Sequence, residues 1–342
     1  MAKPIPDDLL AEARSILIVK PSSFGDIIHT LPSLAAICDA HPHLEARWII
    51  NAGWENILHD HPNLTEVLPF PRKQMRGLGM LPKFFKWGKS LRTGERKRPE
   101  VVLDFQGLLR SAMMTKFRRS EASIGLSDAR EGARHFYRHV VNVDPAAHAI
   151  ERYLEIPRAL GVDIPDKADL RYDLPAGDPL DSEIDLPDQF VLLHPYSRGQ
   201  GKSLTDDQIV ELTNLLAPHP VVLIGQREEG TPSSPFPPHL LDLANATSIP
   251  QLIGLMRKAA FTVSVDSGPM HLAVAVDGSR VLGIHTWTDP RKVGPYHPLA
   301  RVWKAGEIRA YDAWTDDEAS QSILPGSEAI QSMAAHIQSQ LQ

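Results

Sequence analysis

The sequence predicts an α/β protein made of two doubly wound domains. Three observations support this fold class. Short apolar runs alternate with segments of helical length, as parallel strands with helical crossovers require. One acidic, proline-rich stretch interrupts this alternation near the middle of the chain. The length of 342 residues is enough for two cores of ordinary size.

The first half opens on a strand, a tight turn and a helix, in the stretch ILIVKPSSFGDIIHT. Residues 16–19 have the β-branched character of a buried parallel strand, and Pro21 then breaks the run. A helix is expected to begin near Asp26. Further elements of this half are expected as strands at residues 46–50, 65–68 and 101–104 and as a closing helix at 148–160.

The second half repeats the alternation after residues 173–189, which contain three prolines, six acidic residues and no basic residue. The expected elements are strands at 190–194, 221–225, 261–266 and 280–285, and helices at 206–216, 250–258, from 270, and at 327–341. We therefore predict a first domain over 1–172, a linker over 173–189, a second domain over 190–325 and a C-terminal helix over 326–342.

Composition limits the class of protein. The net charge of −6 argues against a general nucleic-acid binder, and the single cysteine, Cys38, suits a reducing cytoplasm. The N-terminal stretch lacks the apolar core of a signal peptide, and no apolar run is long enough to span a membrane, so a soluble protein is expected. The charge is uneven, because residues 72–98 hold ten basic residues and one acidic residue, Glu95.

Three turns at expected strand ends could carry chemistry. The first is PSSFGD, where Gly25 allows close backbone approach and Asp26 is either a helix-capping residue or a catalytic carboxylate. The second is SVDSGPMHLAVAV, where Gly268, Met270 and His271 open a helix whose N–H groups could bind an anion. The alternative for this turn is that Asp266 only caps the helix and His271 is structural.

The third turn is HPYSRGQGKSL, residues 194–204. It lacks the first glycine of a Walker P-loop, yet Arg198 and Lys202 on a glycine-rich loop could contact a diphosphate; the alternative is a solvated loop. The histidines show no metal-binding spacing, so no metal or other cofactor is expected. A G-x-S-x-G elbow is missing, as is a G-x-G-x-x-G after the first strand, which weakens hydrolase and dehydrogenase interpretations.

Four motifs together resemble glycosyltransferase family 9, the bacterial heptosyltransferases that build the inner core of lipopolysaccharide. They are, in the order found in that family, ILIVKPSSFGDIIHTLP, VVLDFQGLLRSA, VSVDSGPMHLAVAV and TDPRKVGPY. The resemblance implies a GT-B architecture, with two Rossmann-like domains facing a cleft, the acceptor on the first, the donor on the second, and the C-terminal helix returning to the first domain. It also implies inverting, metal-independent transfer of heptose from ADP-heptose.

The resemblance assigns roles to individual residues. Asp26 matches the proposed general base. The residues that match donor-binding positions are Ser197, Lys202, Glu228 or Glu229, Asp266, Ser267, Gly268 and His271. The residues implied on the acceptor side are Ser22, Ser23, Gly25, Arg72, Lys73, Arg76, Gln106, Arg110 and Arg130. The family often has Lys-x-Trp-Pro after the phosphate loop, whereas Lys202 is followed by Ser203, Leu204 and Thr205, and VVLIGQREE lacks the usual second glycine.

The expected partners are ADP-heptose, a Kdo-lipid A or inner-core acceptor, and the cytoplasmic face of the inner membrane, with no nucleic acid. The basic segment 72–98 is interpreted as a surface for an anionic acceptor or membrane, and a solvated helix face is the alternative. Three other functions stay open: a family member that uses another nucleotide sugar, a GT-B nucleotide-sugar epimerase, and a non-catalytic protein that binds anionic glycolipid.

Overall fold

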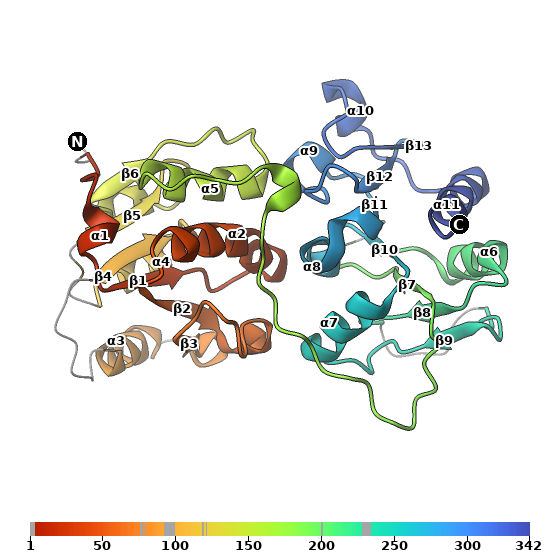
Figure 1. The fold of residues 1–342 in the computed structure, drawn as a ribbon, viewed down its shortest axis with the longest axis horizontal. Helices are drawn as coiled ribbons and strands as arrows, with labels where there is room; N and C mark the ends of the chain where they lie inside the picture. The colour runs from red at the N-terminus through yellow and green to blue at the C-terminus, as the bar shows by residue number, and fades with distance from the viewer. Residues whose placement is uncertain are drawn as a thin grey trace. The chain divides into compact units, whose positions relative to one another are not determined.

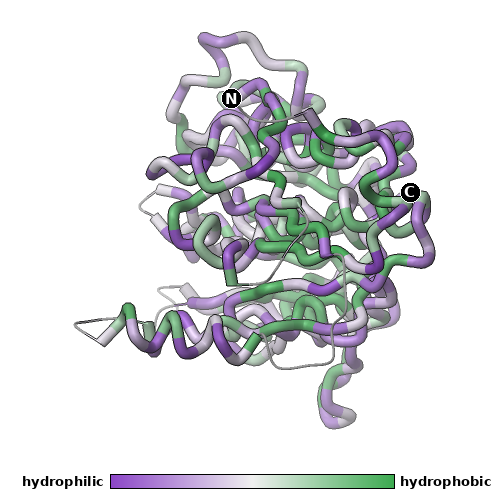
Figure 2. Tube along the Cα trace, turned by 90° about the vertical axis from the view of Figure 1, so that its left-hand side faces the viewer, coloured by the Kyte–Doolittle hydropathy of each residue, from purple (hydrophilic) through white to green (hydrophobic). Residues whose placement is uncertain are grey.

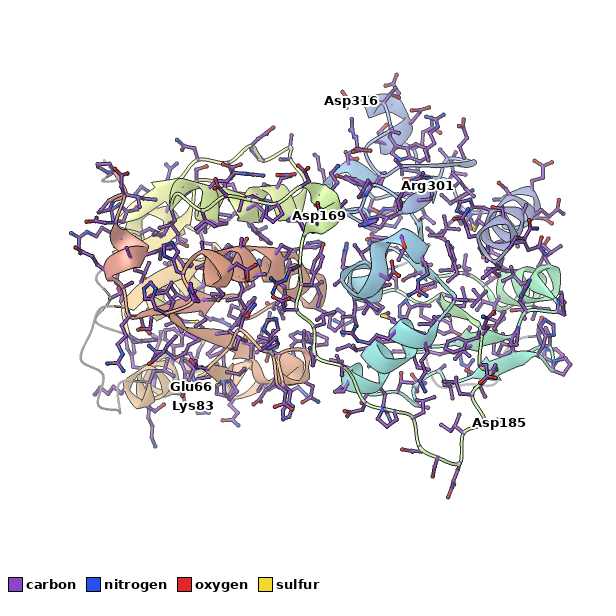
Figure 3. All side chains as sticks on the ribbon, viewed as in Figure 1. Glu66, Lys83, Asp169, Asp185, Arg301 and Asp316 are labelled. Atoms are coloured by element: carbon purple, nitrogen blue, oxygen red, sulfur yellow. The ribbon has the colours of Figure 1, made fainter. Side chains whose placement is uncertain are left out.

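The computed structural model describes residues 4–75, 77, 79–91, 100–117, 120, 122–199, 201–227 and 234–342. The chain divides into two compact units, Met1–Pro175 and Ala176–Gln342 (Figure 1). The division falls inside the acidic stretch 173–189, which contains no helix or strand; Asp185 lies on it (Figure 3). Whether this stretch acts as a linker stays a prediction.

The first unit is a six-stranded sheet in which every pair of neighbouring strands is parallel. Its strands are β1 (Ser15–Val19), β2 (Glu45–Asn51), β3 (Glu66–Phe70), β4 (Glu100–Asp104), β5 (Ala122–Leu126) and β6 (His139–Val141). The order across the sheet is β3-β2-β1-β4-β5-β6. The strands expected at 16–19, 46–50, 65–68 and 101–104 are confirmed with shifts of one or two residues at their ends, whereas β5 and β6 were not predicted.

Helices connect these strands. The helices of the first unit are α1 (Leu9–Glu12), α2 (Phe24–Ala40), α3 (Met80–Ser90), α4 (Leu109–Met114) and α5 (Ala149–Ala159). Helix α2 follows β1 directly and packs against α5, which confirms the expected closing helix. Short 3-10 turns follow β2 and β3, at Ala52–Ile57 and Arg72–Gln74.

The second unit is a seven-stranded sheet in the order β13-β12-β11-β10-β7-β8-β9, parallel except for the last hairpin. Its strands are β7 (Val191–His194), β8 (Val221–Leu223), β9 (Leu240–Asp242), β10 (Phe261–Val265), β11 (Val281–Ile284), β12 (Arg301–Lys304) and β13 (Glu307–Arg309). Its helices are α6 (Asp206–Leu216), α7 (Ile249–Lys258), α8 (Gly268–Asp277), α9 (Pro290–Val293), α10 (Asp316–Ser320) and α11 (Ser327–Gln340). All the elements predicted for this half are present.

Both sheets have the same break in strand order. In the first sheet, β1 lies between β2 and β4, so the chain first builds the sheet outward on one side of β1 and then on the other. In the second sheet, β7 lies between β8 and β10 in the same way. Ligands of open α/β sheets bind outside the carboxyl ends of the strands at such a switch point. The turns after β1 and β4, and those after β7 and β10, are therefore the positions where binding groups are expected to gather.

The central strands are buried along their whole length because helices cover both faces of a parallel sheet. All five residues of β1 and of β10 are buried. Figure 2 shows hydrophobic residues concentrated along the inner segments and hydrophilic residues on the outer turns. Among the described residues, we find no helix with the length and apolar character needed to cross a membrane.

The apolar face of the C-terminal helix is buried within the second unit, and the return of this helix to the first domain stays a prediction. Helix α11 packs on α6, and its buried residues Ile330, Met333 and Ile337 belong to the core of the second unit together with Leu212. The amphipathic pattern predicted correctly that one face is buried, but such a pattern does not specify the surface that covers it.

Candidate active site

Asp26 lies in the first turn of α2, directly beyond the carboxyl end of β1. Its Oδ2 accepts hydrogen bonds from Ser23 N at 3.0 Å and from Ser23 Oγ at 2.5 Å, so Asp26 forms a capping box with Ser23. The side chain stays 37% exposed. The N-cap itself is therefore Ser23, and Asp26 contributes to capping from the third helical position, which leaves Oδ1 available for other groups.

Oδ1 of Asp26 faces two groups that come from the core of the first unit. Tyr153, on α5, donates a hydrogen bond of 3.1 Å to this oxygen, and Lys20 Nζ lies 3.9 Å from it. Lys20 is only 3% exposed; its ammonium donates to Tyr153 Oη at 2.7 Å and to Phe105 O at 2.9 Å. A buried lysine thus donates to a tyrosine, which donates to the carboxylate.

These contacts decide the charge of Asp26. Desolvation by itself would raise the pKa of this carboxyl, but the Lys20 charge and the hydrogen bonds from Ser23 and Tyr153 outweigh it and hold the pKa below its ordinary value. Burial lowers the pKa of Lys20, and the charges of Asp26 and Asp104 oppose that effect. Asp26 is therefore an ionised carboxylate at neutral pH, able to accept a proton from a hydroxyl.

The turn after β4 completes this corner of the sheet. Asp104 ends β4 and is fully buried; its Oδ1 accepts from the N–H groups of Gln106 and Gly107, and its Oδ2 accepts from Tyr137 Oη at 2.8 Å. Burial raises the pKa of Asp104 despite these hydrogen bonds. Gln106 Oε1 in turn accepts from Ser22 N at 3.1 Å, which joins the turns after β1 and β4.

The remaining residues predicted for the acceptor side follow carboxyl ends of strands in the same sheet. Arg72 and Lys73 form the 3-10 turn after β3, Arg110 lies in the first turn of α4 after β4, and Arg130 follows β5. Parallel strands end on one edge of a sheet, so these basic residues share the edge that carries Asp26. Arg76 lies outside the described residues.

Helix α3, part of the basic segment 72–98, is strongly amphipathic. Phe84 and Gly88 are buried against the core, whereas Leu81 and Phe85 are 55% and 45% exposed beside the exposed lysines at 83, 86 and 89. Lys83 marks this helix in Figure 3. Next to the helix lies a cavity of about 370 Å³, lined by Phe85, Lys89, Met113, Lys116, Phe117 and Phe136. Part of the segment, at 92–99, lies outside the described residues.

In the second unit, the turns after β7 and β10 meet. Lys202 Nζ donates to Asp266 Oδ2 at 2.7 Å, and Ser197 Oγ donates to the Asp266 carbonyl at 2.9 Å. Desolvation would raise the pKa of Asp266, but the pKa lies below its ordinary value because the interactions with His285 and Lys202 outweigh desolvation. Since burial lowers the pKa of His285 to about 4, Lys202 is the cation that acts on Asp266 at neutral pH.

The helix predicted after Asp266 is present, but its first turn differs from the expectation in two ways. The N-cap of α8 is Ser267, and the carboxylate of Asp266 pairs with Lys202 instead, so Asp266 does not cap the helix. The N–H of Met270 donates to Ser267 O at 3.1 Å in a tight turn, so it is not the open donor that the sequence suggested. Gly268 is the first helical residue, and His271 is buried in the first turn.

Two buried histidines at strand ends of this sheet were missed by the sequence analysis. His194 ends β7, and its Nδ1 lies 3.2 Å from Ser267 Oγ; burial lowers the pKa of His194 to about 4. His285 follows β11, with Nδ1 2.9 Å from Thr288 Oγ1. A histidine at the end of a buried apolar run was the available signal, but no spacing revealed its partner.

Several other site residues need separate mention. Glu228 and Glu229 lie outside the described residues. Their neighbour Arg227 donates to Asp242 Oδ2 at 2.9 Å. Trp287, in the turn after β11, is 47% exposed and lies beneath Lys202 Nζ, 4.4 Å from its ring centroid. In the part of the chain that the structure describes, no group of three or more histidine, cysteine or acidic residues is arranged to hold a metal ion.

Comparison with known proteins places the chain in a family. A family model described as glycosyltransferase family 9 (heptosyltransferase) matches residues 85–318. The chain is 25% identical over 320 residues to the lipopolysaccharide core heptosyltransferase OpsX of Haemophilus influenzae, covering 88% of each protein. It is 27% identical over 307 residues to lipopolysaccharide heptosyltransferase 1 of Escherichia coli, covering 85% of this chain and 91% of that protein.

The fold is also that of a solved heptosyltransferase. The structure of E. coli heptosyltransferase WaaC with ADP aligns with a TM-score of 0.72 at 23% identity, covering 95% of this chain and 99% of that one. This likeness confirms the predicted GT-B fold class of two Rossmann-like units.

Proposed function

Because the chain belongs to glycosyltransferase family 9, the heptosyltransferase family, we propose that it transfers heptose from ADP-heptose to the Kdo or inner-core region of lipopolysaccharide. Its homologues are named for lipopolysaccharide heptosyltransfer, and a similar fold has been solved with ADP. The observation that carries the chemistry is Asp26, a partly exposed carboxylate held ionised at the switch point of the first sheet.

The proposed reaction is a single displacement without a metal. The acceptor hydroxyl attacks the anomeric carbon of the heptose, Asp26 takes the hydroxyl proton, and the bond to the diphosphate oxygen breaks so that ADP leaves. One displacement inverts the configuration at the anomeric carbon. A general base of this kind typically accelerates the reaction about 10²- to 10⁴-fold.

We assign the donor to the second unit. Lys202 supplies a cation for the departing diphosphate, and the start of α8, at Gly268, supplies N–H groups and the positive end of the helix dipole. Ser197, Ser267 and His271 lie in the same two turns and complete the proposed diphosphate site. Asp266 positions Lys202. One of Glu228 and Glu229 is proposed to meet the ribose.

We assign the acceptor to the carboxyl edge of the first sheet. Kdo and lipid A phosphates are anionic, and the basic residues Arg72, Lys73, Arg110 and Arg130 follow strands of this edge. Ser22, Ser23, Gly25 and Gln106 surround the base in the two joined turns.

The central test compares Asp26→Asn with the unaltered enzyme, using ADP-heptose and a Kdo-lipid acceptor. We expect kcat to fall at least about 100-fold while the affinity for the donor changes little, because the amide cannot accept the proton. The matched control is Asp39→Asn at the other end of α2, where the carboxylate is exposed and pairs with Arg171. Near-normal turnover by the Asp26 variant would contradict the assigned base.

Two further measurements separate the rival functions. Thermal shifts with ADP-, UDP- and GDP-sugars should favour the ADP-sugar, and a preference for UDP or GDP would point to another family activity. Incubation with ADP-heptose alone should leave the donor unchanged, because a transferase needs an acceptor whereas an epimerase does not.

We also propose that the reaction takes place at the cytoplasmic face of the inner membrane, with α3 as the membrane contact. Exposed Leu81 and Phe85, with lysines at 83, 86 and 89, form the apolar and basic surface that anionic bilayers bind, and the neighbouring cavity is lined mainly by apolar side chains. In a sedimentation assay with phosphatidylglycerol vesicles, the protein should appear in the pellet together with the vesicles.

The variant Phe85→Ala combined with Lys89→Glu should release the protein from these vesicles, whereas Lys258→Glu on α7 should not. Equal binding by both variants would argue for the solvated-face alternative.

A further inference from the structure

Trp287 makes a contact that the catalytic assignment leaves unexplained. Its indole lies against the ammonium of Lys202, with Nζ 4.4 Å from the ring centroid, while the same Nζ donates to Asp266 at 2.7 Å. Trp287 is 47% exposed, whereas the side chains of Lys202 and Asp266 are only 15% and 11% exposed. The lysine is thus held between a carboxylate and an aromatic face.

The loop that carries Lys202 needs such support. Its two ends are anchored, since Ser197 Oγ donates to the Asp266 carbonyl and Leu204 N donates to Pro195 O at 3.0 Å. The tip contains Gly199 and Gly201, both with positive φ, a conformation that favours glycine and offers no side chain to pack. The side-chain contacts of Lys202 therefore connect the tip to the turns after β10 and β11.

Fixing a lysine side chain in advance improves binding. A free lysine loses rotamer entropy when it is ordered, and groups that order it before the ligand arrives remove that cost from binding. A carboxylate alone is a poor support for this purpose, because it competes with a diphosphate for the ammonium. A neutral indole attracts the cation through its ring face and does not occupy the N–H donors.

We propose that Trp287 is a positioning residue for the donor: it holds Lys202 over the start of α8, so that an incoming diphosphate draws the ammonium from Asp266 while the indole contact persists. The inference rests on the proposed role of Lys202 as a donor-phosphate ligand. It gives the exposed indole a role distinct from stacking on the nucleotide base.

The test is a double-mutant cycle on ADP affinity, measured by titration calorimetry with unaltered protein, Trp287→Ala, Lys202→Ala and the double variant. We expect Trp287→Ala to raise the Kd for ADP about 3- to 30-fold, the range that a cation–π contact supplies. The same substitution should change the Kd little when Lys202 is already alanine. Trp287→Phe, which keeps an aromatic face, should restore most of the affinity.

Adenosine distinguishes the two roles of the indole, because it carries the base without phosphates. Positioning predicts that Trp287→Ala leaves adenosine binding unchanged. If the loss were equal for adenosine and ADP, or equal with and without Lys202, the indole would be stacking on the base and the inference would be overturned. The control is Leu299→Ala, a 58% exposed side chain of the same unit.

The proposed function and this inference fail in different ways. Unchanged ADP affinity in Lys202→Ala would remove the donor-phosphate role of the lysine, and the inference with it. If Lys202→Ala weakened ADP binding and Trp287→Ala did not, the inference about Trp287 would be overturned and the role of Lys202 would stand. Thermal unfolding of each variant shows whether the unit is still folded, and Trp287→Phe provides a readout if the alanine variant is unstable.

Discussion

The Tyr153 hydroxyl donates a hydrogen bond of 3.1 Å to Asp26 Oδ1, across 127 residues of sequence, and itself accepts one from Lys20 at 2.7 Å. Desolvation raises the pKa of Tyr153 well above its usual value, and the Asp26 charge adds to this effect, so the hydroxyl keeps its proton and acts as a donor. The proposed base is therefore oriented by α5, a helix that is distant in sequence but belongs to the same unit.

Removing this hydroxyl should weaken and retune the base. In Tyr153→Phe the carboxylate loses a hydrogen bond that favours its ionised form, so the pKa of Asp26 rises and the acid limb of the pH profile of kcat moves to higher pH. We expect kcat at neutral pH to fall about 3- to 10-fold, the value of one hydrogen bond.

The measurement for Tyr153→Phe is kcat against pH, with donor at saturating concentration. The matched control is Tyr172→Phe, a buried tyrosine of the same unit whose carbonyl lies 3.2 Å from His61 Nε2. An acid limb that stays in place, or moves to lower pH, would show that the hydroxyl does not act on the base.

Much of the fold followed from local patterns. Continuous apolar runs predicted β1 and β10, and the polar turns after them located Asp26 and Asp266, because strand ends in a parallel sheet are recognisable from a few neighbouring residues. The partners of these residues could not be predicted in this way. Tyr153 reaches Asp26 from a distant helix, and nothing local indicates which side of a helix faces a given carboxylate.

The same limit explains what the local patterns left open or missed. The pattern of α11 indicated a buried face but not its partner, and the short strand β6 has too few residues to show an alternation. The N–H of Met270 was expected to be free to bind an anion, but it donates to the Ser267 carbonyl. That hydrogen bond depends on backbone geometry, which the residue types do not determine.

Gly125 should be intolerant of any side chain. A Cβ on this residue of β5 would overlap the ring of Tyr137, whose hydroxyl donates to the buried Asp104 at 2.8 Å. Gly125→Ala must therefore displace the ring and cost Asp104 one hydrogen bond; we expect a loss of about 2 to 4 kcal/mol in the free energy of unfolding.

Urea denaturation followed by circular dichroism measures this loss for Gly125→Ala. Gly53→Ala is the control, because a Cβ there meets nothing within 4 Å. In a cycle with Tyr137→Phe the two effects should be less than additive, since both remove the same hydrogen bond. Full additivity would show that the ring stays in place.

The buried histidines should make the second unit less stable in mild acid. Burial lowers the pKa of His194 and of His285 from 6.5 to about 4, although Asp266 opposes this for His285. Between these values the unfolded chain binds protons that the folded chain does not, so stability rises with pH by up to about 1.4 kcal/mol per pH unit for each histidine.

Replacing both residues, His194→Asn with His285→Asn, should flatten the dependence of unfolding free energy on pH between about 4 and 6.5. The double variant is also expected to be less stable at pH 7, so the slope, and not the absolute value, is the readout. His59→Asn is the control, since that ring is 69% exposed. An unchanged slope would mean that other groups set the acid sensitivity.

Helix α11 should stabilise the second unit and leave the first unaffected. Ile337 is fully buried in the core that includes β7 and α6, so Ile337→Ala should cost about 2 to 5 kcal/mol through lost burial and the cavity left behind. Hydrogen exchange locates the effect: amides of β7 and α6 should exchange faster, while those of β1 and α2 keep their protection.

Gln331→Ala, on the exposed side of the same helix, should change the unfolding free energy by less than about 0.5 kcal/mol. Faster exchange in β1 or α2 would instead support the packing on the first unit that the family resemblance implied.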